Sequence, residues 1–131
     1  MSDDVIPADA RQFLLRSIDS VAQLEGLLWL RAHAGQGFDA ATVASHLYIA
    51  EDDAARLLSR LAQRGLVVIE VAADLRHYVY RPSTPELDAM VTQIDALYRQ
   101  NLIPVTNLIH SKSKSRIEAF ADAFRLRKDK P

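Results

Sequence analysis

The sequence predicts a mainly α-helical protein that carries one small β-ribbon between its fourth and fifth helices. Three observations lead to this prediction. Apolar residues recur at helical spacings of three and four over most of the chain. Two short stretches, 67–71 and 78–80, are dense in β-branched and aromatic residues. Capping residues, glycines and prolines divide the helical pattern into short segments.

The first two helices are expected at residues 7–18 and from residue 20 to the glycines that follow residue 34. Pro7 is acceptable in a first helical turn. Ser20 can cap the second helix, with Gln23 as its reciprocal partner. The pattern therefore predicts two amphipathic helices joined by a very short connection.

The middle of the chain predicts a helix-turn-helix followed by a wing. Asp39 is a good N-cap for a short helix over 40–47, and a three-residue turn leads to a second helix over about 51–64 that Gly65 closes. The two β-rich stretches form a two-stranded ribbon that reverses at 72–75. This order is that of a winged helix-turn-helix with helical extensions at both ends.

A long helix is expected after Thr84-Pro85, which read as an N-cap and a proline at the first helical position. Pro104 should break it about one turn earlier, near Gln100. A polar linker over 111–115 leads to a last helix from about residue 116. We divide the chain into an N-terminal extension (1–19), a winged-helix domain (20–82) and C-terminal dimerisation helices with a basic tail (83–131).

Apolar residues on the two C-terminal helices predict a homodimer. Those of the long helix form a seam at alternating steps of four and three, which exposes more apolar surface than one short terminal helix can cover. The expected interface residues are Leu87, Val91, Ile94, Tyr98, Val105, Leu108, Phe120 and Phe124.

Composition and motifs argue against several classes of function. The chain has no cysteine, and its four histidines never fall at metal-binding helical spacing, so neither a metal nor another cofactor is expected. No phosphate loop and no catalytic-triad signature is present, so we expect no enzyme. No apolar run is long enough for a membrane span and the N-terminus lacks a signal-peptide layout, which favours a cytoplasmic protein.

Charge is distributed unevenly along the chain. Residues 1–109 hold nine arginines, no lysine and fourteen acids, whereas residues 110–131 hold seven basic residues and three acids. The basic C-terminal segment can bind an anionic partner, or it can be a solvated surface that keeps the chain soluble.

Two stretches resemble the winged-helix transcriptional regulators of the MarR type. RLLSRLAQRGLV (56–67) is similar to the end of that family's recognition helix, and ADLRHYVYRP (73–82) to its wing. The resemblance implies a DNA-binding regulator whose terminal helices form a dimer. It also implies that Arg76 reaches the minor groove and that Asp74 orients it.

The start of the second helix of the helix-turn-helix departs from this family's pattern. Glu51, Asp52 and Asp53 stand where the family supplies hydroxyl or basic side chains, and carboxylates oppose phosphate binding. They can instead complement the helix dipole, or pair with the arginines that follow. The alternative function is a winged-helix module that binds another protein through this surface and does not bind DNA. The candidate DNA-binding residues are Arg56, Ser59, Arg60, Arg64, Arg76, His77 and Arg81.

Overall fold

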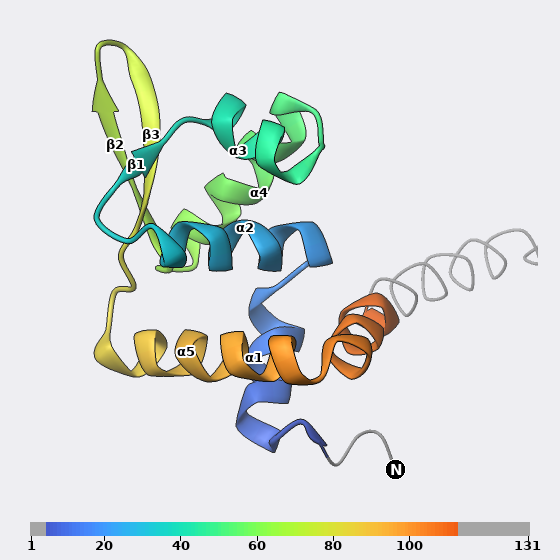
Figure 1. The fold of residues 1–131 in the computed structure, drawn as a ribbon. Helices are drawn as coiled ribbons and strands as arrows, with labels where there is room; N and C mark the ends of the chain where they lie inside the picture. Colours follow the sequence, from blue (N-terminus) through green and yellow to red (C-terminus); the bar gives the residue numbers. More distant parts are fainter. Residues whose placement is uncertain (1–4, 113–131) are drawn as a thin grey trace, which may run out of the picture.

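A computed structural model describes residues 5–112 and confirms the winged helix-turn-helix (Figure 1). The expected last helix, with Phe120 and Phe124, lies outside the described residues. The elements are α1 (Ala8–Ser17), α2 (Val21–Ala32), β1 (Gly37–Phe38), α3 (Ala40–Leu47), α4 (Glu51–Gln63), β2 (Val67–Ala72), β3 (Leu75–Tyr80) and α5 (Pro85–Gln100). A further helix begins at residue 102 and continues to the last described residue.

The predicted N-caps form where the sequence places them. The side chains of Ser20, Asp39 and Thr84 each accept a hydrogen bond from a backbone N–H in the first turn of the helix that follows. Gln23 completes the cap at Ser20, although its Oε1 accepts from the backbone N–H of Asp19 rather than from that of Ser20. These local hydrogen bonds fix where α2, α3 and α5 begin.

The sheet has one strand more than predicted. β1 pairs antiparallel with β3, so the order is β1-β3-β2 and the expected ribbon becomes three-stranded. A two-residue strand leaves no alternating pattern in the sequence. Gly37 favours the close pairing, because a Cβ at that position would lie only 3.0 Å from Cβ of His77. The wing reverses at Ala73-Asp74, both of which have the positive φ of a two-residue hairpin turn.

The predicted break before Pro104 is confirmed. α5 ends at Gln100, and Asn101 is not helical. Proline has no N–H and its ring clashes with the carbonyl four residues earlier, so the chain ends one helix and starts another. No helix among residues 5–112 has the length and apolar character that a membrane crossing requires.

The apolar seam predicted along the long helix lies on α5 and on the helix over 102–112 and is largely covered within the single chain, while its assignment to a dimer interface stays a prediction. Val91, Ile94 and Val105 are fully buried and Leu108 is 6% exposed. They belong to one hydrophobic core that also contains residues of α1, α2 and α4. Leu87 and Tyr98 are half-buried against this core. The sequence pattern alone did not show that α1 and α2 cover this seam. The division into domains stays a prediction, since one core runs through its first two segments and into the third.

Polar contacts join α2 to α5 above this core. Arg31 of α2 forms a salt bridge of 2.8 Å with Asp95, a carboxylate that Arg99 also contacts. The hydroxyl of Tyr98 donates to Glu25 of α2. Burial, together with the hydrogen bond to the Glu25 carboxylate, raises the pKa of Tyr98 to about 12. The hydroxyl of Tyr98 therefore has its hydrogen-bond partner within the single chain.

Candidate nucleic-acid interface

The outer face of α4 is the surface that the helix-turn-helix leaves exposed. Ala54, Leu58 and Leu61 turn inward and are fully buried. On the opposite side lies a shallow hollow of about 370 Å³, lined by Ala55, Arg56, Ser59, Arg60 and Gln63. The amphipathic pattern of α4 thus presents small and hydrogen-bonding side chains outward, which suits contact with a polar surface.

A second hollow lies between α4 and the wing. It measures about 250 Å³ and is lined by Asp39, Ala40, Glu51, Ala55, Ser59, Leu75, Arg76 and Tyr78. Ala55 and Ser59 line both hollows, so the outer face of α4 and the inner face of the wing form one continuous surface. We call it the α4–wing surface.

The wing supplies one uncommitted cation to this surface. The side chain of Arg76 is exposed and, within residues 5–112, has no hydrogen-bond or ion-pair partner. Arg81 lies 3.8 Å from Glu70 at the base of the wing, and both side chains are more than half exposed. His77 is half-buried. Of the three basic wing residues predicted to bind DNA, Arg76 is the one whose guanidinium is free.

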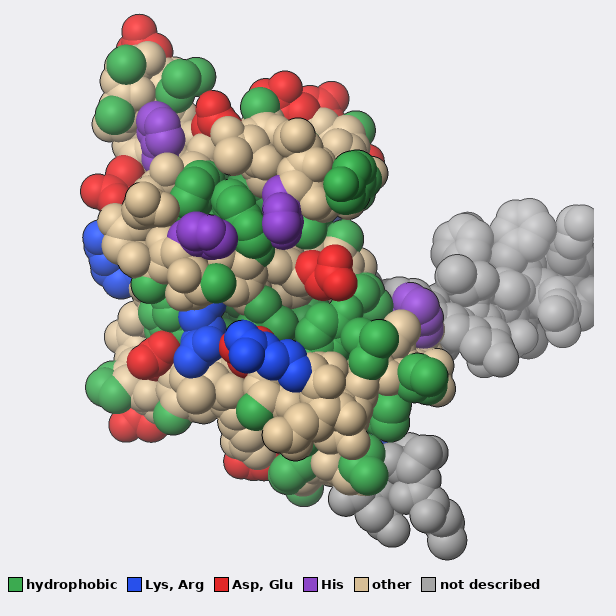
Figure 2. Space-filling model, viewed as in Figure 1, with side chains coloured by type: hydrophobic (Ala, Val, Ile, Leu, Met, Phe, Trp, Pro, Cys, Tyr) green, Lys and Arg blue, Asp and Glu red, His purple; other side chains and the backbone are tan. Residues whose placement is uncertain are grey.

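Carboxylates border the same surface. Hydrogen bonds from Thr42 and the charge of His77 lower the pKa of Asp39 below its ordinary value. Glu51, Asp52 and Asp53 are exposed in the first turn of α4. Figure 2 shows acidic side chains gathered on the part of the molecule formed by α3 and α4. Ala50, the N-cap, has no side chain that could satisfy the free N–H groups, so the dipole role of these acids stays a reasonable prediction.

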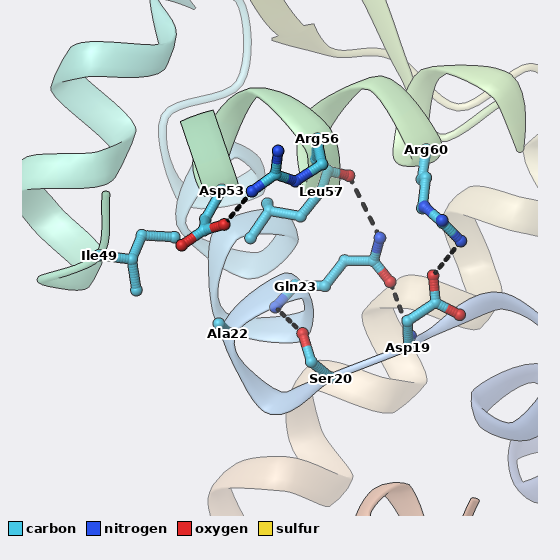
Figure 3. A pocket seen from close by; sticks show the side chains of 9 residues that line it. All are labelled: Asp19, Ser20, Ala22, Gln23, Ile49, Asp53, Arg56, Leu57 and Arg60. Atoms are coloured by element: carbon cyan, nitrogen blue, oxygen red, sulfur yellow. Dashed lines mark hydrogen bonds and ion pairs between the residues drawn. The ribbon is translucent and has the colours of Figure 1, made fainter. Parts of the chain in front are cut away.

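Arg56 and Arg60 of α4 and Arg64, its C-cap, do not form one stripe. Arg56 is exposed and forms an ion pair with Asp53, as the sequence spacing allowed. Arg60 reaches Asp19, in the connection between α1 and α2, rather than an acid of its own helix (Figure 3). Arg64 turns inward, where its Nη1 donates to the backbone carbonyl of Ser17 at 2.6 Å. No pattern in the sequence indicates these longer-range partners.

Two histidines meet on the only tryptophan, which sequence spacing also did not reveal. The rings of His33 and His46 each lie with their centroids 4.7 Å from that of Trp29, and Phe38 packs beside them. Trp29 and Phe38 are half-buried, so they form an aromatic cluster at the edge of the core. Among residues 5–112, no group of three or more His, Cys, Asp or Glu side chains is placed to hold a metal ion.

Comparison with solved structures places this architecture among known folds. No protein-family model and no curated protein sequence matches the chain. The structure is similar to MepR, a transcription regulator of a multidrug efflux pump of Staphylococcus aureus, with a TM-score of 0.54 and 18% identity over 94% of this chain and 90% of that chain.

Two further structures show the same likeness. A MepR variant bound to an oligodeoxyribonucleotide gives a TM-score of 0.53 with 20% identity, covering 88% of this chain and 87% of that one. BpsR of Bordetella bronchiseptica, described by the regulation of its DNA binding by 6-hydroxynicotinic acid, gives 0.52 with 18% identity over 93% and 86%. At such identities the likeness concerns architecture: this chain has the winged-helix fold of the MarR-type transcriptional regulators.

Proposed function

We propose that this protein is a DNA-binding transcriptional regulator that acts as a homodimer. The observation that carries the proposal is the α4–wing surface, where Ser59 lies between the exposed Arg56 and Arg60 on one side and the unpartnered Arg76 on the other. Arginine is suited to phosphate contact because its guanidinium donates in a fixed fork geometry. The shared fold with a protein solved on an oligodeoxyribonucleotide supports the same direction.

In this proposal the outer face of α4 enters the major groove and the wing lies along the adjacent backbone. Arg56, Arg60 and Arg76 contact phosphates. The short side chain of Ser59 lies on the outer face of α4, where it reaches base edges or the DNA backbone. Arg64 supports the fold rather than the DNA, since its guanidinium already has partners at Ser17 and Asp19. The nearby carboxylates keep the affinity modest and sensitive to salt.

Arg76→Ala tests the role of the wing. Losing one phosphate contact should weaken binding to all duplex sequences by a similar factor and reduce the slope of log K against log salt by about one. Fluorescence anisotropy of a labelled duplex, titrated at several salt concentrations, measures both quantities.

The control is Arg99→Ala, which removes another exposed arginine, paired with Asp95 on α5 and away from the α4–wing surface. It should leave the salt slope at the parental value. If Arg76→Ala binds like the parent at every salt concentration, the wing does not hold phosphate. If the parent binds no duplex at all, the proposal of DNA binding fails.

For the dimer, we propose a contact surface that the burial of the α5 seam leaves over. Leu102 and Ile103 are 52% and 70% exposed at the start of the helix over 102–112. Burial of such exposed apolar side chains favours association. A second copy of this chain, related by a two-fold axis, would cover them with the same patch of its own surface.

Ile103→Asp should convert the dimer to a monomer in sedimentation velocity at tens of micromolar protein. The carboxylate would fall in the first turn of a helix, where the dipole favours it, so the fold should be retained. Val71→Asp is the matched control, because Val71 is 69% exposed on the wing. Dissociation by both variants, or by neither, would contradict this interface.

A further inference from the structure

The connection between α1 and α2 holds a carboxylate that reaches into the candidate interface. Asp19 has a side chain that is only 17% exposed. Arg64 contacts its Oδ2 at 3.0 Å, Arg60 the same oxygen at 3.4 Å, and Lys112 its Oδ1 at 3.4 Å. One acidic group therefore lies among cations from α4 and from the helix over 102–112.

Two of these three cations are held by further hydrogen bonds within the fold. Arg64 is 26% exposed and also donates to the carbonyl of Ser17. Lys112 is 13% exposed and donates to the carbonyl of Ile18 at 3.1 Å. Each is anchored by a backbone oxygen as well as by Asp19, so neither depends on that carboxylate alone for its position.

Arg60 differs from both. It is 57% exposed, and among residues 5–112 its one ion pair is the 3.4 Å contact to Asp19. It also lines the outer hollow of α4 and a cavity of about 470 Å³ that lies between α4 and the start of α2 (Figure 3). The side chain thus sits at the border between the outward face of α4 and the flank that faces Asp19.

The charge balance favours exchange at Arg60. Burial of Asp19 is outweighed by the hydrogen bond and charge of Arg64 and by the charge of Lys112, which together lower the pKa of Asp19 below its ordinary value. Asp19 is therefore ionised at neutral pH, and it keeps these two cationic partners if Arg60 leaves. An exposed ion pair of this length contributes little, so a phosphate can compete for the guanidinium.

We infer that Asp19 is a positioning residue that holds Arg60 beside α4 in the free protein and competes with DNA phosphate for it. The inference rests on the proposed function. DNA binding would then exchange the Asp19–Arg60 pair for an Arg60–phosphate pair. Asp19 itself would touch no DNA, but its charge would set how readily Arg60 takes part.

Asp19→Asn tests this inference, because the amide keeps the shape of the side chain and an oxygen that can accept from Arg64 while it removes the charge. Duplex affinity should rise several-fold at low salt, and the salt slope should steepen by up to about one as Arg60 gains a phosphate contact. In an Arg60→Ala background the same substitution should have no such effect. Asp19→Glu, which keeps the charge, should stay near the parent.

Asp9→Asn is the control for net charge, since Asp9 is an exposed acid in the first turn of α1. Circular dichroism checks the fold of every variant, and Asp19→Ser replaces Asp19→Asn if the latter does not fold. An unchanged or weaker affinity of the folded variant, or a gain that persists without Arg60, overturns the inference while the proposed function stands. If no variant and no parent binds duplex, both fall together.

Discussion

Ile94→Ala is expected to lower the free energy of unfolding by about 2–5 kcal/mol and to leave the oligomeric state unchanged. Ile94 is fully buried in the core of the single chain, where α5 packs against residues of α1 and α2. Truncation removes buried apolar atoms and leaves a cavity that the surrounding helices fill only in part. The substitution should therefore lower stability without changing subunit association.

Urea denaturation at one fixed protein concentration measures this loss, since the apparent stability of a dimer depends on concentration. Gln100→Ala is the control on the same helix, because Gln100 is exposed, and it should change stability by less than about 0.5 kcal/mol. If Ile94→Ala dissociated into monomers but kept the parental stability, Ile94 would belong to the subunit interface and not to the core of the single chain.

The double substitution Asp52→Ser with Asp53→Thr is expected to raise nonspecific duplex affinity roughly tenfold at low salt. It removes two exposed negative charges from the first turn of α4 and releases Arg56 from its ion pair with Asp53. Phosphates that approach α4 come within one Debye length, about 8–10 Å, of these positions. The gain should shrink as salt rises.

The fold should lose about 1 kcal/mol through the weaker interaction with the helix dipole. The new hydroxyl groups do not offset this loss, because the N-cap position is Ala50, one residue before the first of the three acids. The matched control combines Asp9→Asn with Glu86→Gln, which neutralises first-turn acids of α1 and α5. If the control and test variants gain equally in duplex affinity, the effect reflects net charge rather than the position of these acids in the first turn of α4.

Local signals in the sequence predicted most of the fold. The caps at Ser20, Asp39 and Thr84, and the break before Pro104, each depend on residues within one helical turn. The wing was visible because β-branched and aromatic residues flank a short turn. β1 was missed, since two residues carry no pattern and the strand exists only through its pairing with β3.

The site was predicted less well because its electrostatics depend on distant partners. The spacing of Arg60 and Arg64 suggested pairing within α4 or with phosphates, yet both meet Asp19, more than forty positions earlier in the chain. The seam of α5 looked uncovered because sequence periodicity shows which residues share a face but not what lies against it. Only the packing of α1 and α2 supplied that information.

The most direct test of the DNA-binding proposal is to map the surface that a duplex touches. Amide chemical shifts of isotope-labelled protein, followed by NMR during titration with a short DNA duplex, report contacts residue by residue. We expect the largest changes at Ala55, Ser59 and Gln63 on α4 and at Arg76 on the wing, with little change along α5. Changes confined to residues outside α4 and the wing, or none at saturating duplex, would contradict it.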